Sequence, residues 1–139
     1  MAISLNSFTP NTKIESSKVN TNFTNVKTAI EDASYRAFSW GFVGGVGVEN
    51  SQGMRWIATQ NLTVKTLYAK TTSGTCTIRI KADSTEIHAG FAVTSTIGNT
   101  SSFAATTITA GQLVTIDVTA AATCVDLYVM LETQPTTIA

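Results

Sequence analysis

The residues of this chain that could do chemistry are few and lie far apart. His88 is the single histidine, and in the stretch TEIHAGF it alternates with Glu86, so both would project from one strand face. A hydrolytic triad needs a histidine beside a nucleophile and a carboxylate, and the sequence contains no nucleophile-elbow motif. We therefore expect His88 to have a surface or packing role, and we do not expect an enzyme.

Two other patterns that suggest chemistry fail on spacing. The glycines at 41, 44, 45 and 47 suggest a dinucleotide or phosphate site, but the fingerprint that begins at Gly45 and Gly47 needs a glycine at position 50, which is Asn. We expect these glycines to bend a strand or to allow close backbone approach. Cys76 and Cys124 are too few for a zinc site or a disulfide framework, and we expect them to be buried free thiols, with their separation left open.

No metal or cofactor is therefore expected. The sequence has no histidine pair for zinc and no acidic Ca²⁺ loop of the EF-hand type. A Ca²⁺ site built from irregular loop carboxylates is the one metal site that the sequence leaves open.

Aromatic side chains offer a non-catalytic chemistry. Exposed rings bind sugars in many β-sandwich proteins, and the candidate ligand-binding residues here are Trp40 and Trp56. The other aromatic residues of the β region that could form such a platform are Tyr68, Phe91, Phe103 and Tyr128. Large rings also dominate burial in protein cores, so packing of Trp40, Phe42 and Trp56 in the core is the competing expectation. The first interpretation gives an alternative function, a carbohydrate- or host-receptor-binding module that acts through exposed aromatics.

The elements that would position these residues are mainly strands. Charged residues make up 13% of the chain, and threonine, with 25 copies, fills much of the polar surface. Threonine is β-branched and suits a pleated, half-wet face. We expect a mainly β protein, an antiparallel β-sandwich that is jelly-roll-like. The alternation of apolar and polar residues between turn residues predicts eight strands, at 39–48, 54–59, 62–71, 75–82, 86–93, 101–108, 113–119 and 124–132.

Charge and hydropathy argue against two classes of partner. Nine basic and nine acidic residues give a formal net charge of zero, and the basic residues are scattered singly. Nucleic acid or a membrane surface would call for a basic patch, so neither is expected as a partner. The N-terminus lacks the features of a signal peptide, and no apolar run approaches the ~20 residues of a transmembrane helix. We expect a protein made in the cytoplasm.

One amphipathic helix is predicted before the strands, starting at Ser16 or Ser17 as N-cap. Its apolar residues recur with the alternating spacing of a coiled-coil heptad. A helix of this length is marginal alone in water, so this seam must pack on the β domain or on copies of itself. Ala37 falls at the next a position, which extends the predicted helix to 16–37. The seam residues are Phe23 and Ile30 at a, and Val19, Val26 and Ala33 at d.

Residues 1–15 form an arm with no predicted element. Ile3, Leu5 and Phe8 are its apolar residues, and a turn signal follows at Pro10. These side chains either tuck onto their own domain or dock into a neighbouring subunit. The predicted organisation is an anchoring arm at 1–15, a helix at 16–37 and a β-sandwich domain at 38–139.

The segment KIESSKVNTNFTNVKTAI resembles one that recurs in tailed-bacteriophage virion proteins, namely fibres, spikes, collar appendages and head decorations. In that family the segment opens a helix that joins a virion-anchoring N-terminus to a β domain, often in a trimer. The β region resembles small phage jelly-roll-like domains in style, with a Trp-rich first hairpin and the strands LVTIDV and DLYVMLE. The residues that carry the first resemblance are Ile14, Ser17, Val19, Asn20, Asn22, Phe23 and Ile30.

The resemblance implies a non-enzymatic virion structural protein, made in the host cytoplasm. It would be a trimeric head fibre or decoration protein, or a tail or collar appendage. Its partners would be further copies of the chain and capsid, collar or tail proteins, and in the alternative function a host-surface glycan. The implied oligomerisation residues are Val19, Phe23, Val26, Ile30 and Ala33, and the implied virion-anchoring residues are Ile3, Leu5 and Phe8.

Overall fold

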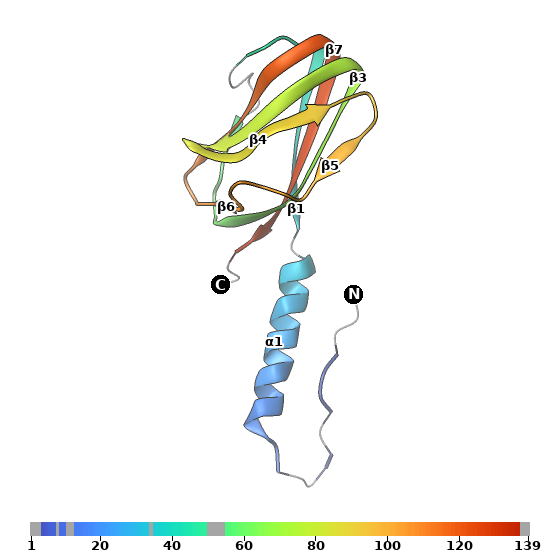
Figure 1. The fold of residues 1–139 in the computed structure, drawn as a ribbon. Helices are drawn as coiled ribbons and strands as arrows, with labels where there is room; N and C mark the ends of the chain where they lie inside the picture. Colours follow the sequence, from blue (N-terminus) through green and yellow to red (C-terminus); the bar gives the residue numbers. More distant parts are fainter. Residues whose placement is uncertain (1–3, 8, 11–12, 34, 50–54, 137–139) are drawn as a thin grey trace.

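The computed structural model describes residues 4–7, 9–10, 13–33, 35–49 and 55–136. One helix stands below a β domain, and the N-terminal arm runs back alongside the helix (Figure 1). The elements are α1 (Ser16–Ala33), β1 (Arg36–Gly45), β2 (Arg55–Ile57), β3 (Leu62–Ala82), β4 (Thr85–Val93), β5 (Gly98–Thr100), β6 (Thr107–Ile108) and β7 (Leu113–Pro135).

The strands form one antiparallel hydrogen-bonded sheet in the order β1-β7-β3-β4. Strand β2 pairs with β7, and β5 and β6 pair with β3. Two long strands, β3 and β7, are therefore the centre of the domain, and the short strands add to their edges (Figure 1). The predicted fold class is confirmed: the protein is mainly β, antiparallel and sandwich-like, with a single helix before the strands among the described residues.

The core lies between the two halves of this folded sheet. Leu67 and Leu131, from the halves of β3 and β7 nearest α1, belong to the same buried cluster as Ile78 and Ile116 from the other halves. All four side chains are fully buried. Each side chain of this size stabilises the fold by about 1.5–3 kcal/mol when buried, so this cluster is the main source of stability.

Both long strands were predicted as pairs of shorter ones. Residues 62–71 and 75–82 form the single strand β3, and 113–119 and 124–132 form the single strand β7, so the described residues form seven strands where eight were predicted. The residues between the predicted strands stay paired across a bulge, where the register shifts, instead of turning. Within 101–108 only Thr107–Ile108 is a strand, and β5 was not predicted.

Strands β1, β7 and β3 are joined where they bend by one carboxylate, that of Asp126. The Gly44 N–H donates to Asp126 Oδ1 at 2.7 Å, and the Thr72 hydroxyl donates to Asp126 Oδ2 at 2.9 Å. These bonds lower the pKa of Asp126, with the Gly44 N–H as the largest cause. Gly44 (φ 109°) lies where the register of β1 shifts, which confirms the prediction that glycines in this segment bend a strand.

Gly74 allows the backbones of β3 and β7 to approach each other closely near the Asp126 carboxylate. Its φ is 70°, in the left-handed region that glycine adopts easily. A Cβ on Gly74 would lie 2.1 Å from the Thr123 carbonyl oxygen. Thr123 itself has φ 46°, so the two strands share the bend.

The helix ends earlier than predicted. α1 ends at Ala33, and Ala37 lies in β1 opposite Glu132 instead of at a helical seam position. Two interactions draw this segment into the sheet: Arg36 pairs with Thr133, whose hydroxyl donates to the Arg36 carbonyl at 3.1 Å. The β domain therefore begins at Arg36, two residues before the predicted boundary.

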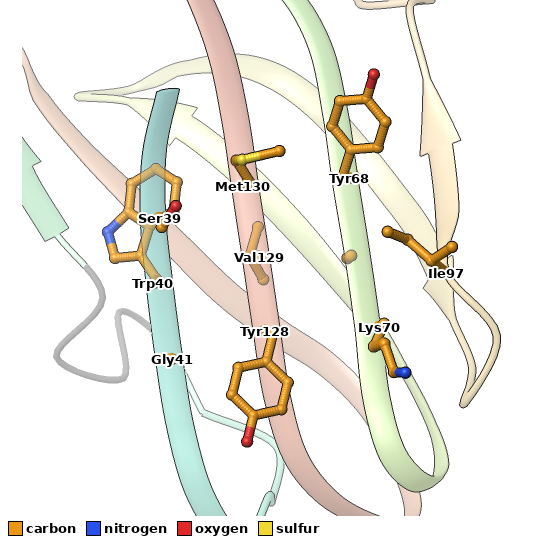
Figure 2. Close-up of a pocket in the computed structure, with 10 residues that line it drawn as sticks. Ser39, Trp40, Gly41, Tyr68, Lys70, Ile97, Tyr128, Val129 and Met130 are labelled. Carbon is orange, nitrogen blue, oxygen red and sulfur yellow. The ribbon is translucent and has the colours of Figure 1, made fainter. Parts of the chain in front are cut away.

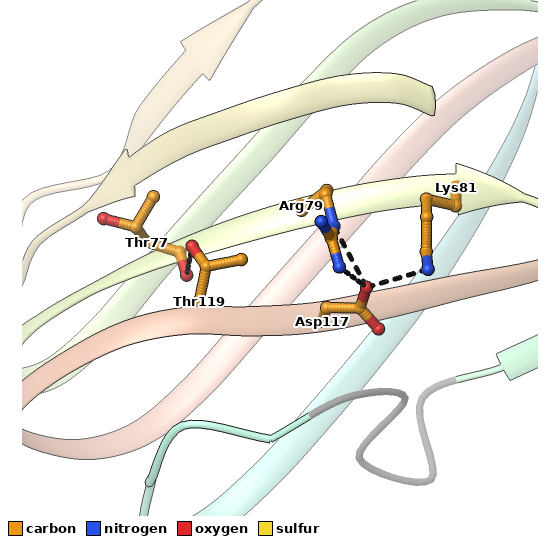
Figure 3. A network of polar contacts seen from close by, with 5 residues as sticks. All are labelled: Thr77, Arg79, Lys81, Asp117 and Thr119. Carbon is orange, nitrogen blue, oxygen red and sulfur yellow. Dashed lines mark hydrogen bonds and ion pairs between the residues drawn. The ribbon is translucent and has the colours of Figure 1, made fainter. Parts of the chain in front are cut away.

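A buried carboxylate ties β7 to β3 beyond the bend. Asp117 is fully buried and lies directly opposite Arg79. Arg79 donates to Asp117 Oδ2 through Nη2 at 2.7 Å and Nε at 3.1 Å, and Lys81 Nζ lies 3.3 Å from the same oxygen (Figure 3). A buried charge needs partners of this kind, so the network has a structural role.

Candidate self-association site

The apolar seam of α1 is exposed in the single chain. The helix points away from the β domain, so most of its length lies beyond the sheet (Figure 1). Phe23 is 72% exposed and Ile30 is 47% exposed, whereas Val19 and Val26 are half-buried. An 18-residue helix rich in Asn and Thr is marginal in water without a packing partner. The seam is therefore an apolar stripe that the chain's own β domain leaves open.

A hollow of about 230 Å³ lies on this seam. Its lining residues are Val19, Asn22, Phe23 and Val26. In the heptad these residues occupy positions d, g, a and d in sequence. In parallel coiled coils, a set of four neighbouring residues of this kind forms the hole that receives one side chain of the facing helix. The side chain that matches this hole is the a residue of a second copy, which is Phe23.

The N-terminal arm is attached to one flank of the same helix. Asn22 Oδ1 accepts from the Asn6 N–H at 2.7 Å, and Asn22 Nδ2 donates to the Asn6 carbonyl at 3.1 Å. One turn later, Asn25 Nδ2 donates to the Ser4 carbonyl at 2.6 Å. At about 100° per residue, Asn22 and Asn25 lie to one side of the seam. The arm thus covers a flank and leaves Phe23 accessible.

Of the three predicted anchoring residues, the structure describes Leu5. Leu5 is 53% exposed, although the arm backbone on both sides of it is hydrogen-bonded to α1. Ile3 and Phe8 lie outside the described residues, as does the side chain of Ala33 at the end of α1. The anchoring role of all three arm residues stays a prediction.

The two predicted ligand-binding tryptophans pack against the core. Trp56 stacks on Phe38 with ring centroids 3.9 Å apart, and Trp40 lies 6.3 Å from Trp56. Both tryptophans are half-buried. The expectation that Trp40, Phe42 and Trp56 pack in the core is confirmed, since all three lie against the buried cluster. Neither tryptophan forms a flat exposed platform.

His88 lies between aromatic rings. Its imidazole meets Phe91 and Phe103 edge-on, with centroids 5.8 and 6.1 Å away. Its Nδ1 is buried without a hydrogen-bond partner among the described residues. The packing role predicted for His88 agrees with this environment.

The two cysteines are free and buried, as predicted. The pKa of Cys76 is raised to about 12, chiefly because burial disfavours the thiolate and also because its thiol hydrogen-bonds with Cys124. The thiols are therefore neighbours in the core, which answers the question of their separation. A thiol with this pKa is a poor nucleophile at neutral pH.

A second hollow lies on the outer face of the sheet, and Trp40 is the predicted ligand-binding residue that borders it. It measures about 380 Å³ and crosses β1, β7 and β3 (Figure 2). Tyr68, Lys70 and Tyr128 are among its lining residues. Tyr128 alternates with the apolar residues Leu127 and Val129 along β7. The pairing of β7 with β3, which brings it beside Lys70 and Tyr68, cannot be predicted from a single sequence.

Comparisons with known proteins identify no relative: family models, curated proteins and solved structures were searched, and none matches this chain. Within the described residues, no cluster of three or more His, Cys, Asp or Glu side chains could hold a metal ion. The same part of the chain contains no helix with the length and apolarity needed to cross a membrane.

Proposed function

We propose that this chain is a non-enzymatic structural protein of a tailed-bacteriophage virion, assembled as a parallel trimer through α1. The single observation that carries the proposal is the exposed seam of α1 with its four-residue hole beside Phe23. The arm serves attachment, and the β domain is the displayed part. Within a virion, the chain would act as a head fibre or decoration protein, or as a tail or collar appendage.

The energetics favour association of the helices. Each large apolar side chain gains about 1.5–3 kcal/mol on full burial, and a trimer would bury Phe23 and Ile30 from three chains at once. Val19 and Val26 would complete their burial in the same interface. This gain offsets the loss of translational and rotational freedom on assembly, and it supplies the packing partner that α1 lacks alone.

Asn22, one of the residues that carry the resemblance to virion proteins, has a defined structural role in this chain. Among the residues Val19, Asn20, Asn22 and Phe23 of the resembling segment, the apolar residues form the seam and Asn22 holds the arm. A seam with Phe at a and Val at d suits two or three helices, and the resemblance favours three. Parallel helices would place all β domains at one end, because each domain follows the C-terminal end of its own α1 (Figure 1).

The alternative function, glycan or receptor binding through Trp40 and Trp56, has less support. Both rings pack with other aromatic side chains and against the core. A domain that is displayed can also bind a ligand, however.

Quantitative mass spectrometry of purified virions tests the proposed function. Particles of the phage that encodes this chain should contain it in a copy number divisible by three. Disruption of α1 by Phe23→Asp, introduced in the phage genome, should remove the chain from the particles, whereas Thr28→Asp on the opposite helix face should not. Absence of the wild-type chain from purified particles would refute the virion role.

A further inference from the structure

The outer hollow is built by two successive rungs of the sheet. In the first rung, Gly41 of β1 and Lys70 of β3 both lie opposite Tyr128 of β7. In the second, Ser39 and Tyr68 both lie opposite Met130. Side chains two residues apart on a strand share a face, so both rungs present their side chains to the same side of the sheet (Figure 2).

The rings of this hollow remain accessible to solvent. Tyr128 is 46% exposed, and Ile97, which borders the hollow at β5, is 62% exposed. Tyr128 leans over Gly41, where an added Cβ would meet its Cδ1 at 3.6 Å. Because Gly41 has no side chain, the ring can lie low across β1 and keep part of its surface open. A ligand here would pack one apolar face on the rings and leave its other face in water.

The polar groups around the hollow can still form ion pairs and hydrogen bonds with a ligand. Lys70 is the single charged residue that lines it, and its ammonium has no ion-pair partner in the described part of the chain. The hydroxyls of Tyr68 and Tyr128 likewise make no hydrogen bond to other described residues. An ammonium without an ion-pair partner attracts an anion, and the open hydroxyls can bond to the hydroxyls of a ligand.

The geometry points to a binding site for an acidic saccharide on this face, with a sugar ring packed against Tyr128 and its carboxylate beside Lys70. A pyranose has one apolar C–H face and a rim of hydroxyls, which matches an exposed ring bordered by polar groups. The hollow of about 380 Å³ falls at the small end of the roughly 300–1,000 Å³ range of ligand sites. This inference does not depend on the trimer or on the virion role.

Titration of the full-length protein with two oligosaccharides tests the site. The probes are a hyaluronan hexasaccharide, which carries glucuronate, and chitohexaose, which is neutral; binding is followed by two-dimensional NMR at fixed ionic strength. Hyaluronan should bind more tightly and should shift the signals of Tyr68, Tyr128 and Met130. Tyr128→Ala should weaken its binding about tenfold, and Tyr128→Phe should retain most of it.

Matched variants distinguish a direct contact of Lys70 with the ligand from non-specific attraction by the net charge of the protein. Lys70→Glu should weaken hyaluronan binding by at least about fivefold, whereas Lys65→Glu makes the same charge change elsewhere on β3 and should leave it unchanged. Tyr35→Ala removes another exposed tyrosine and should also have no effect. These variants lie on the surface, so the folded state should persist in all of them.

Three results would overturn the inference. Equal affinity for the two probes would remove the acidic specificity, and equal effects of Lys70→Glu and Lys65→Glu would indicate non-specific charge attraction. Absence of saccharide binding combined with a change of oligomeric mass in Tyr128→Ala would assign the hollow to contact between copies of this chain.

Discussion

The side-chain amide of Asn22 pairs with the backbone of Asn6 as a neighbouring strand would, accepting from its N–H at 2.7 Å and donating to its carbonyl at 3.1 Å. A third hydrogen bond joins the two side chains, because Asn6 Nδ2 donates to Asn22 Oδ1 at 3.2 Å. These bonds hold the arm on the flank of α1 while Leu5 stays half-exposed and Phe23 faces outward. The arm and the seam can therefore act independently, one in attachment and the other in self-association.

Removal of the Asn22 amide should release the arm without dissolving the assembly. In Asn22→Ala all three hydrogen bonds between Asn22 and Asn6 are lost, at about 0.5–1.5 kcal/mol each. Hydrogen exchange at the Asn6 amide should become about tenfold faster or more. Asn20→Ala removes an exposed asparagine from another face of α1 and should leave this exchange rate unchanged. Equal protection of Asn6 in both variants would contradict the role of Asn22.

Gly74 should be the least replaceable of the glycines at positive φ. In Gly74→Ala the new Cβ meets the Thr123 carbonyl oxygen as well as an unfavourable φ, so the free energy of unfolding should fall by at least about 2–4 kcal/mol. Gly111→Ala has a positive φ but open space around it, and should lose about 1–2 kcal/mol. Urea denaturation measures both free energies of unfolding. Equal losses would show that the close approach of Gly74 to β7 does not add to the cost of the positive φ.

Asp126 should make stability depend on acid pH. Its folded pKa lies below its ordinary value, so its ionised form stabilises the fold at neutral pH. That contribution should disappear as the pH falls through about 3.9 toward the lower folded pKa. Asp126→Asn suits the left-handed backbone at this position but carries no charge. Its melting temperature should therefore lie below that of the wild type at pH 7, with a gap that narrows in acid.

The control for the charge of Asp126 is Glu86→Gln, which neutralises an exposed carboxylate on β4. This variant should follow the wild-type melting temperature across the same pH range. A gap of constant size between wild type and Asp126→Asn would mean that the carboxylate charge does not hold the bend.

Cys76 and Cys124 should be unreactive in the native protein. Because the pKa of Cys76 is raised to about 12, almost none of the Cys76 thiol is ionised at pH 8, and both cysteines are buried. A colorimetric thiol reagent should therefore report no reaction in the native state and two thiols per chain in guanidinium chloride. Rapid reaction of the native protein would mean that the core around these residues opens.

The local pattern of apolar and polar residues was sufficient to predict the helix and the composition of the core. The spacing of Val19, Phe23, Val26 and Ile30 places them on one side of α1, because helical periodicity is a local property. The start of α1 at Ser16 was predicted for the same reason. Its end was not, since the pairing of Arg36 with Thr133 joins residues that lie far apart in the sequence.

Long-range register explains what the sequence could not predict. Ser73 and Gly74 have the composition of a turn, yet β3 continues through them because β7 bends at the same level. The hollow around Tyr128 arises from the alignment of three strands, and the hydrogen bonds of Asn22 arise from an arm that folds back on its helix. No local pattern encodes these relationships.

Light scattering of the full-length chain tests the central claim most directly. The wild type should have three times the 14.7 kDa mass of one chain, and Phe23→Asp should be a monomer because it places a charge in the seam. Thr28→Asp adds the same charge on the far side of α1 and should remain a trimer. A wild-type monomer, or a trimer that survives Phe23→Asp, would contradict self-association through this helix.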